Sequence, residues 1–363
     1  MSTKDPIEEL ATYRVQNLTP YLSARRIGGR GHTFLNANEA PKSAAYLLNS
    51  TSLNRYPECQ PPKLIEAYAD YAGVPEDYVL VSRGSDESIG LLVRTFCESG
   101  EDQILIVPPT YGMYKISADT FGVDTIEVPP VGDFEPDVER IKQHLNNPSQ
   151  SIKVIFLCSP NNPTGTILKQ SALEEILEAT KDKCLVVVDE AYIEFCPEFT
   201  KVPLLKKYRN LVITRTLSKA FALAGIRCGF TLADPTIIKL MLKVIDPYPI
   251  SDPVAQIALQ ALSKNGLDIL KDRINELNER KHRFIDAVSK LSIVDEIFSD
   301  KANYILLRFK DDSSKVFDKF VRRGVILRDF STKPLLKNSI RITIGSEEEM
   351  KEVLNILEEL NKA

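Results

Sequence analysis

Lys219 is placed for amine chemistry, because it follows an apolar run that ends at Ile213 and stands among small, hydroxylated and apolar residues. Such a run is typical of a buried strand. Desolvation at the end of the strand disfavours the ammonium form, so the amine can attack a carbonyl carbon. Thr216, Ser218 and Arg227 are residue types that bind phosphate. This stretch therefore predicts a site for a phosphorylated aldehyde, although a lone Ser-Lys pair is more often a surface feature.

A glycine turn at Gly84 leads from a predicted strand, 78–81, into a predicted helix. The free backbone amides at a helix N-terminus, together with the helix dipole, form an anion site. Ser85 and Asp86 are also favourable capping residues. The same pattern fits an ordinary capped helix, which Gly90 near its start is expected to weaken slightly.

Polar side chains follow further apolar strands, predicted at 104–107, 154–158 and 184–188, and these side chains are Tyr111, Asn162, Asp189 and Tyr192. In an open α/β sheet, ligands bind beyond the carboxyl ends of the strands. A carboxylate in apolar surroundings needs a cation or a hydrogen-bond donor, and a pyridinium N–H is such a partner for Asp189. Asn162 and Tyr192 can bond a ring oxygen, and Tyr111 can stack on the ring. Pyridoxal 5'-phosphate (PLP) is the cofactor that these groups fit together.

Composition places the chain among ordinary globular enzymes. The 363 residues are 43% hydrophobic and 26% charged, with a net charge of −4, a length that predicts two domains. Neither nucleic acid nor an anionic membrane is expected as a partner, because the chain has no basic excess. No apolar run reaches the roughly 18 residues of a membrane span, and the first ten residues do not resemble a signal peptide, so we expect a cytoplasmic protein. The three histidines and six cysteines show no metal-ligand spacing, and we expect no metal.

Three units are predicted along the chain. Residues 1–33, which contain several glycines and arginines, predict an extended arm. Residues 34–250 form the large domain, of which 34–50 are the part that would pack with the small domain, and residues 251–363 form the small α/β domain. The proline-rich stretch 244–253 predicts the hinge between them.

Two arginines of the C-terminal unit, Arg328 and Arg341, stand at predicted strand positions beside apolar neighbours. An unpaired arginine is costly there, so each is expected either to bind an anionic ligand or to form an internal salt bridge.

Several motifs together resemble those of one enzyme family over nearly the whole chain. Asn-Pro-Thr-Gly at 162–165, Asp-x-x-Tyr at 189–192 and Ser-Lys at 218–219 are those of the fold-type I PLP-dependent enzymes. Asn-Arg-Tyr-Pro at 54–57 and Arg-Gly-x-Asp-Glu at 83–87 resemble the class II aminotransferase branch that contains the histidinol-phosphate aminotransferases. The resemblance implies a large domain with a mostly parallel seven-stranded sheet between helices, a small α/β C-terminal domain and an N-terminal arm.

The resemblance also implies a role for each site residue. Lys219 would hold PLP covalently and move the proton, and Asp189 would keep the ring nitrogen protonated. Asn162 and Tyr192 would bind the ring hydroxyl, with Tyr111 stacked on the ring. The phosphate would be held by Ser85, Asp86, Thr216, Ser218, Arg227 and Tyr56 of the partner subunit in a homodimer. The substrate would be bound by Tyr21, Asn162, Arg328 and Arg341.

The implied activity is transamination of L-histidinol phosphate with 2-oxoglutarate, which gives imidazole-acetol phosphate and L-glutamate. The alternative within the same fold is an aromatic aminotransferase or a phosphothreonine decarboxylase. A transcription regulator with an aminotransferase-like body would need a DNA-binding domain ahead of the arm, where the sequence offers no residues for one. A P-loop NTPase would need Gly-x-x-x-x-Gly-Lys-Ser/Thr, which does not occur.

Overall fold

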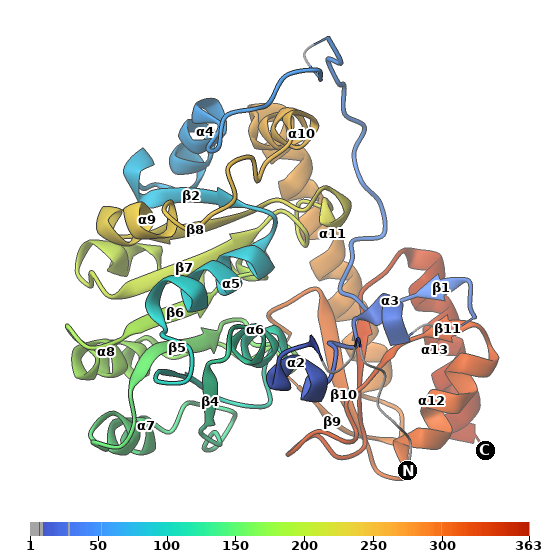
Figure 1. Ribbon diagram of the computed structural model, residues 1–363. Helices are drawn as coiled ribbons and strands as arrows, with labels where there is room; N and C mark the ends of the chain where they lie inside the picture. The colour runs from blue at the N-terminus through green and yellow to red at the C-terminus, as the bar shows by residue number, and fades with distance from the viewer. Residues whose placement is uncertain (1–6, 8–9, 28–29, 52, 299, 363) are drawn as a thin grey trace.

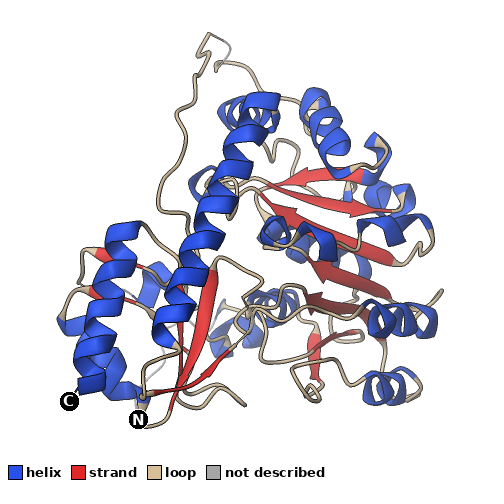
Figure 2. Cartoon of the chain, turned by 180° about the vertical axis from the view of Figure 1, so that it is seen from behind, coloured by secondary structure: helices blue, strands red, loops and turns tan. Residues whose placement is uncertain are grey.

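The computed structural model describes residues 7, 10–27, 30–51, 53–298 and 300–362. Gly28 and Gly29 of the predicted arm lie outside the described residues. A larger body surrounds a seven-stranded sheet and a smaller body surrounds a four-stranded sheet (Figure 1). The long helix α11 (Lys264–Val288) runs along both when they are seen from behind (Figure 2). Among the described residues, no helix has the length and apolarity that a bilayer crossing requires.

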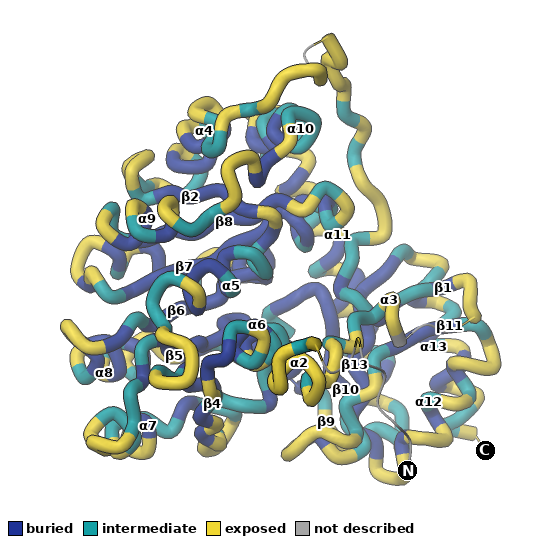
Figure 3. Tube along the Cα trace, in the orientation of Figure 1, coloured by how far each residue is buried: buried dark blue, intermediate teal, exposed yellow. Residues whose placement is uncertain are grey.

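The large sheet has the strand order β2-β8-β7-β6-β5-β3-β4. Only β8 runs antiparallel to its neighbours, so the predicted mostly parallel seven-stranded sheet is confirmed. Its central strands are buried on both faces (Figure 3), which is why they form continuous apolar runs in the sequence. The strands are β2 Val79–Ser82, β3 Gln103–Ile106, β4 Asp124–Glu127, β5 Ile152–Cys158, β6 Leu185–Asp189, β7 Leu211–Thr216 and β8 Gly229–Ala233.

The predicted ends of two strands, at residues 188 and 213, are wrong. Asp189 pairs with Thr214 in the parallel ladder of β6 and β7, and Thr216 pairs with Gly229 across β7 and β8. Both strands therefore continue past their apolar runs, because backbone hydrogen bonds extend a ladder whatever the side chains are. Asp189 and Thr216 are thus fixed by the sheet itself and not by a loop.

Helices cover both faces of the large sheet. Alternate strand residues point to opposite faces, and Val186 and Val188 pack in one cluster while Val187 packs in another. The first cluster includes residues of α4 (Pro62–Ala72), α7 (Val138–Leu145), α8 (Gln170–Ala179) and α10 (Asp252–Leu262). The second includes residues of α5 (Ser85–Phe96), α6 (Met113–Phe121) and α9 (Pro235–Met241).

Short 3₁₀ helices fill the connections of the large body. They are η1 Glu76–Tyr78, η2 Ile193–Phe195, η3 Pro197–Phe199, η4 Val202–Lys206 and η5 Ala224–Ile226. Three of them lie between β6 and β7, and η2 begins directly after Tyr192.

The smaller sheet has the order β12-β13-β10-β9. Its elements are β9 Val294–Ile297, β10 Tyr304–Phe309, β12 Arg328–Asp329 and β13 Ser339–Thr343, with helices α12 Ser313–Arg322 and α13 Glu347–Lys362. A capping box opens α13, since Ser346 N donates to Glu349 Oε2 at 2.6 Å and Glu349 N to Ser346 Oγ at 3.2 Å.

Residues near the start of the chain are tied to this smaller body. The strand β1 (Thr33–Phe34) pairs in parallel with β11 (Val325–Ile326). Helix α10, which begins the predicted small domain, lies instead beside α4 of the larger body (Figure 1). The side chain of Gln260 in α10 also hydrogen-bonds the backbone of Leu47. The domain boundaries at 33 and 250 stay predictions.

The extended arm expected from the sequence instead holds two short helices, α2 (Tyr13–Asn17) and α3 (Ala24–Ile27). Thr12 caps α2 by accepting from Val15 N at 3.4 Å, a local bond that favours a helical turn. The segment rests on its own chain, with Arg14 Nη1 3.5 Å from Asp124 Oδ1.

Gly90 offers a direct test of the helical packing. We expect Gly90→Ala to raise the free energy of unfolding by about 0.5–1 kcal/mol, because glycine inside a helix leaves more backbone entropy to lose on folding. There is room for the methyl group, since a Cβ at Gly90 would lie 3.5 Å from Phe121 Cε2. Chemical denaturation measures the difference.

Gly84→Ala is the matched control. Its φ is +79° and a Cβ there would come within 2.6 Å of Arg227 Nη2, so this variant should lose stability. A Gly90→Ala protein that is no more stable than the parent would contradict the packing of α5 against α6.

Candidate active site

The polar residues predicted to act together gather at one edge of the large sheet. Asn162 follows β5, Asp189 ends β6, and Lys219 follows β7. These three strands are neighbours and parallel, so their carboxyl ends meet at the same edge. Arg341 of β13 reaches this edge from the smaller sheet and donates from Nη1 to Asn162 Oδ1. The site therefore lies between the two sheets.

Lys219 is held as a reactive amine. Its Nζ donates to the carbonyl oxygen of Ala37 at 2.9 Å and lies 5.7 Å from the centre of the Tyr192 ring. Burial lowers the pKa of Lys219 to about 8, and the positive charge of Arg341 lowers it further, whereas Asp86 and Glu39 oppose the shift. A sizeable fraction of the neutral amine is thus present near pH 7 to 8.

Asp189 is buried, with 3% of its surface exposed. Its Oδ2 accepts from the Tyr114 hydroxyl at 2.8 Å and its Oδ1 from Ala191 N at 3.2 Å. Burial raises the pKa of Asp189 to about 6, against the lowering effect of the Tyr114 hydrogen bond. No cation of the described chain lies within ion-pair distance of this carboxylate. Its two hydrogen bonds leave the negative charge without a cation, so a positively charged N–H group would be a favourable partner.

Three consecutive residues, Asn36, Ala37 and Asn38, form what we call the 36–38 strap, because each binds one predicted site residue. Asn36 O accepts from Arg341 Nη2 at 2.9 Å, and Ala37 O accepts from Lys219 as described. Asn38 Nδ2 donates to the Tyr192 hydroxyl at 2.9 Å. The strap thus fixes an arginine, an amine and a phenol relative to one another.

Asn38 itself is fixed from the smaller sheet. Its φ is +54°, a left-handed conformation that asparagine tolerates better than most residues. Its N–H donates to Thr343 Oγ1 at 3.1 Å, and its Oδ1 accepts from the same hydroxyl at 3.2 Å. Burial raises the pKa of Tyr192 above its usual value, so this phenol stays protonated.

Arg341 and Arg328 have donors left over. Arg341 is 5% exposed, its guanidinium lies 5.2 Å from the ring centre of Tyr304, and its Nε has no hydrogen-bond partner. Arg328 donates from Nη2 to Leu22 O at 3.0 Å, while its buried Nη1 has no partner. Neither arginine pairs with a described carboxylate, so the internal salt bridge predicted as the alternative is wrong for both.

Tyr21 lies with these two arginines. Burial raises the pKa of Tyr21, and the charges of Arg328 and Arg341 act in the opposite direction. Its ring stands edge-on to Tyr111, with 6.3 Å between the centroids. Two arginines without a counter-charge, beside a phenol, form a pocket that suits an anion.

The predicted phosphate ligands also come together. Arg227 donates to Ser218 Oγ from Nη1 and to Asp86 Oδ2 from Nη2, both at 3.2 Å. Thr216 Oγ1 donates to Ser218 Oγ at 2.9 Å. The first amides of α5, at Ser85 and Asp86, have no acceptor within the helix and are available to an anion.

Glycine makes this cradle possible at two positions. A Cβ at Gly84 would collide with Arg227 Nη2, as noted above, and a Cβ at Gly229 would come within 2.6 Å of Ser85 N. Glycine at both positions therefore allows Arg227 and the backbone of β8 to approach the start of α5 closely.

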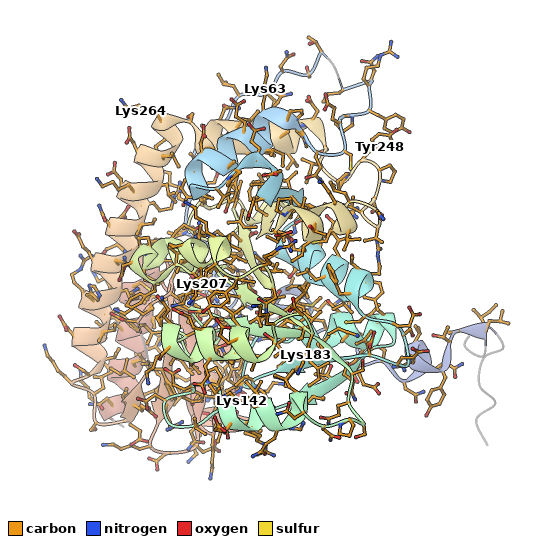
Figure 4. All side chains as sticks on the ribbon, turned by 90° about the vertical axis from the view of Figure 1, so that its left-hand side faces the viewer. Lys63, Lys142, Lys183, Lys207, Tyr248 and Lys264 are labelled. Carbon is orange, nitrogen blue, oxygen red and sulfur yellow. The ribbon has the colours of Figure 1, made fainter. Side chains whose placement is uncertain are left out.

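The roles of Tyr56 and Tyr111 stay predictions. Tyr56 is 80% exposed and stacks on Tyr248 at 4.3 Å, away from the residues around Lys219. Tyr248 is 50% exposed and lies at the outside of the molecule (Figure 4). Tyr111 donates from its hydroxyl to Asp86 Oδ1 at 2.9 Å and stands edge-on to Tyr114, with 5.7 Å between the ring centroids.

Sequence reasoning missed Asn38 and Tyr114. Asn38 lies in a polar stretch, residues 36–39, and the sequence does not indicate which residues this stretch contacts. Tyr114 stands three residues after Tyr111 in the sequence, yet nothing local indicates that its hydroxyl reaches Asp189, 75 residues away.

Relatives of known type match nearly the whole chain. The family described as aminotransferase class I and II matches residues 28–357. The histidinol-phosphate aminotransferase of Aeromonas hydrophila subsp. hydrophila is 56% identical over 354 residues, which cover 98% of each chain. That of Yersinia enterocolitica is 50% identical over 357 residues, 98% of this chain and 94% of its own.

Solved structures share the fold. Histidinol-phosphate aminotransferase from Sinorhizobium meliloti, in complex with pyridoxal-5'-phosphate, has a TM-score of 0.85 at 22% identity and covers 97% of this chain and 98% of its own. The enzyme from Clostridium acetobutylicum has a TM-score of 0.81 at 22% identity and covers 91% of this chain and 99% of its own.

Proposed function

Because this chain belongs to the aminotransferase class I and II family, and so is a PLP-dependent transaminase with the fold-type I architecture that its motifs predict, we propose that its amino donor is L-histidinol phosphate. The products with 2-oxoglutarate would be imidazole-acetol phosphate and L-glutamate, a step of histidine biosynthesis. The 56% identity to a curated histidinol-phosphate aminotransferase supports this choice over other substrates.

The observation that carries the proposal is the uncompensated pair Arg328 and Arg341 beside Lys219. Arg341 Nε and Arg328 Nη1 are buried donors without partners. Both proposed substrates carry oxyanions, the phosphate of histidinol phosphate and the carboxylates of 2-oxoglutarate, and guanidinium groups bind both kinds. Tyr21 would add a hydroxyl to the same pocket.

The residues of the site fit PLP. The buried Asp189 carboxylate has no cationic partner in the described chain, and Arg227 lies beside the free amides at the start of α5, a combination that binds phosphate. We propose that Asp189 faces the ring nitrogen and that Asn162 and Tyr192 bind the ring hydroxyl. Ser85, Asp86, Thr216, Ser218 and Arg227 would hold the phosphate. When bound, PLP supplies an electron-accepting ring that stabilises negative charge on the substrate carbon.

The chain's own part is proton transfer and positioning. With a pKa of about 8, the Lys219 amine is suited to take a proton from the substrate carbon and to return it, because proton transfer is most effective when the pKa lies near the working pH. Above pH 6, Asp189 is ionised and can hold a positive charge opposite it. The Tyr192 hydroxyl, protonated and oriented by Asn38, can donate to an oxygen of the cofactor ring.

Asn38 is expected to act as a positioning residue. We expect Asn38→Ala to lower kcat about tenfold with little change in KM, because the Tyr192 hydroxyl loses the hydrogen bond that orients it. The pH titration of the bound cofactor's absorbance should also shift, which a purely structural role would not cause. Asn38→Ala added to Tyr192→Phe should have almost no further effect on the titration, and full additivity would contradict the role.

Competition between substrates tests the proposed function. The purified holoenzyme is given L-histidinol phosphate, L-phenylalanine and O-phosphothreonine together, with 2-oxoglutarate as acceptor. We expect kcat/KM for histidinol phosphate to exceed that for phenylalanine by at least about 10²-fold, since phenylalanine has no phosphate and its only anion, the carboxylate, is bonded directly to the reacting carbon. Preferred consumption of phenylalanine, or decarboxylation of phosphothreonine, would overturn the proposal.

We also propose a cytoplasmic homodimer in which Tyr56 of the partner subunit completes each phosphate site. The exposed apolar side chains of the segment around Tyr56 support a contact with a second copy, since Leu47 is 84% and Leu53 is 53% exposed. Tyr56→Phe subunits should bind PLP more weakly, and mixing them with inactive Lys219→Ala subunits should raise the activity in the heterodimer. Failure of exchanged subunits to regain any activity would contradict shared sites.

A further inference from the structure

Arg341 differs from the other buried arginines of the described chain in its lack of a carboxylate partner. Arg215, Arg280 and Arg341 are exposed to nearly the same extent, 6%, 6% and 5%. Arg215 Nη2 lies 2.8 Å from Glu190 Oε2, and Arg280 Nε lies 3.2 Å from Glu347 Oε2. No ion pair among the described residues includes Arg341. Its charge must be stabilised in another way, because burial of an unpaired charge is costly.

Two aromatic rings take the place of the carboxylate. The guanidinium carbon of Arg341 lies 5.2 Å from the ring centre of Tyr304 and 5.3 Å from that of Phe330. The face of an aromatic ring attracts a cation, and the attraction is stronger where water is excluded. A ring has no net charge, so it stabilises the guanidinium without neutralising it. The two hydrogen bonds of Arg341 are also to neutral acceptors, the Asn162 side chain and the Asn36 carbonyl.

Tyr304 is held by both sheets. It belongs to β10 and pairs with Thr343 of β13, two positions from Arg341, so these three side chains point to the same face of the smaller sheet. Its hydroxyl donates at 2.6 Å to Asn161 O, in the connection that follows β5 of the large sheet. Burial raises the pKa of Tyr304 well above its usual value, so the hydroxyl stays protonated and remains a donor.

Asn161 is a fixed anchor for this hydroxyl. Its N–H donates to Thr166 O at 2.8 Å, and its Nδ2 donates to Pro109 O and to Thr164 Oγ1, both at 2.9 Å. The bond from Tyr304 therefore ties a ring of the smaller sheet to a well-bonded part of the larger one, and the ring stays in its place beside the guanidinium.

We propose that Tyr304 and Phe330 are positioning residues that keep Arg341 buried, oriented and without a counter-charge, so that its charge is available to the acidic group of a substrate. A carboxylate in their place would also hold the arginine, but it would repel that acidic group. The inference rests on the part of the proposed function that makes Arg341 a receptor for substrate anions.

Glutarate is a suitable probe, because it has the two carboxylates of 2-oxoglutarate and no keto group that could react. Calorimetric titration of the holoenzyme measures its dissociation constant. Arg341→Gln should weaken glutarate binding at least about tenfold. Tyr304→Leu, which removes the ring, should weaken it about tenfold. Tyr304→Phe keeps the ring and loses only the bond to Asn161, so it should weaken binding about threefold.

A double-mutant cycle separates positioning of the arginine from a general structural effect. Tyr304→Leu added to Arg341→Gln should weaken glutarate binding no further, because the ring acts through the guanidinium. Full additivity of the two losses would overturn the inference. Phe330→Leu should weaken binding as Tyr304→Leu does, which keeps the test decisive even if the leucine variant at Tyr304 folds poorly.

Tyr208 provides the matched control. It is 7% exposed, Lys207 Nζ lies 4.5 Å from its ring centre, and its hydroxyl donates to Glu174 Oε2 at 3.1 Å. Tyr208→Leu should bind glutarate as the parent does, and a loss equal to that in Tyr304→Leu would overturn the inference.

The results also separate this inference from the proposed function. Equal glutarate affinity of the parent and Arg341→Gln would overturn the receptor role of Arg341, and the inference with it. A loss in Arg341→Gln without a loss in Tyr304→Leu or Phe330→Leu would overturn the inference alone. Neither result depends on which amino donor the enzyme uses.

Discussion

Lys219→Ala is expected to lower the rate of transamination by at least about 10⁴-fold, because one side chain supplies both the covalent hold on the cofactor and the proton transfer. The long-wavelength absorbance that PLP acquires on the parent enzyme should be lost at the same time. Steady-state kinetics and an absorbance spectrum of the purified variant measure both effects. A variant with the parent's spectrum would show that another amine holds the cofactor.

Lys281 provides a matched control. It is also buried, burial likewise lowers its pKa to about 8, and its Nζ donates to Asn278 Oδ1 and Ala302 O, both at 2.9 Å. Lys281→Met should keep the spectrum and most of the activity. Borohydride reduction of the parent, followed by peptide mass analysis, should find the cofactor on Lys219 and not on Lys281. A label on Lys281 would mean that a low pKa alone selects the lysine.

Asp189→Asn is expected to lower the rate about 10²–10³-fold, because a neutral amide cannot stabilise positive charge on the ring nitrogen. The loss should appear in kcat, with a smaller change in the KM of either substrate. Reconstitution with a cofactor analogue whose ring nitrogen carries a permanent positive charge should recover part of the rate. No recovery, together with an unchanged affinity for PLP, would contradict the role given to this carboxylate.

Asp189→Asn also changes how the stability of the protein depends on pH. The folded-state pKa of Asp189, about 6, lies above the usual value of 3.8, so the folded chain binds the proton more tightly than the unfolded chain does. Stability of the cofactor-free protein is therefore lost as the pH rises from about 4 to 6. Asp189→Asn should remove this loss, and thermal unfolding at pH 4 and pH 7 would measure it.

Tyr114→Phe tests the hydrogen bond from Tyr114 to Asp189 separately from the negative charge of Asp189. It leaves the carboxylate in place and removes the 2.8 Å hydrogen bond from the Tyr114 hydroxyl. That hydrogen bond lowers the pKa of Asp189, so the pKa should rise in the variant. Its effect on kcat should be about tenfold or less, and the acidic limb of the pH profile should move upward. A loss as large as that of Asp189→Asn would mean that the hydrogen bond matters more than the charge.

The sequence was sufficient for the part of the site that one sheet builds. Asn162, Asp189 and Lys219 each follow or end an apolar strand, and parallel neighbouring strands bring their ends together whatever the rest of the fold does. The phosphate cradle was also predictable, because a glycine turn into a helix is a local feature.

Contacts between the two sheets were not predictable in the same way. Asn38 reaches Tyr192 across 154 positions in the chain, and Arg341 reaches Asn36 across 305. Such pairs depend on how the smaller sheet docks against the larger one, and no local periodicity encodes that arrangement. Tyr114 was missed because its bond to Asp189 depends on where α6 packs against the sheet.

The 36–38 strap limits how this enzyme could be recombined with its relatives. Leu35, directly ahead of the strap, donates from its N–H to Ile326 O at 2.9 Å and accepts from Thr343 N at 3.0 Å. A chimera that exchanges only the C-terminal third would keep Lys219, Tyr192 and the strap. The strap would then contact a smaller sheet from the other parent, to which it is not fitted. A functional chimera must therefore take residues 33–38 and the C-terminal unit from the same parent, although all the strands of the large sheet lie between them in the chain.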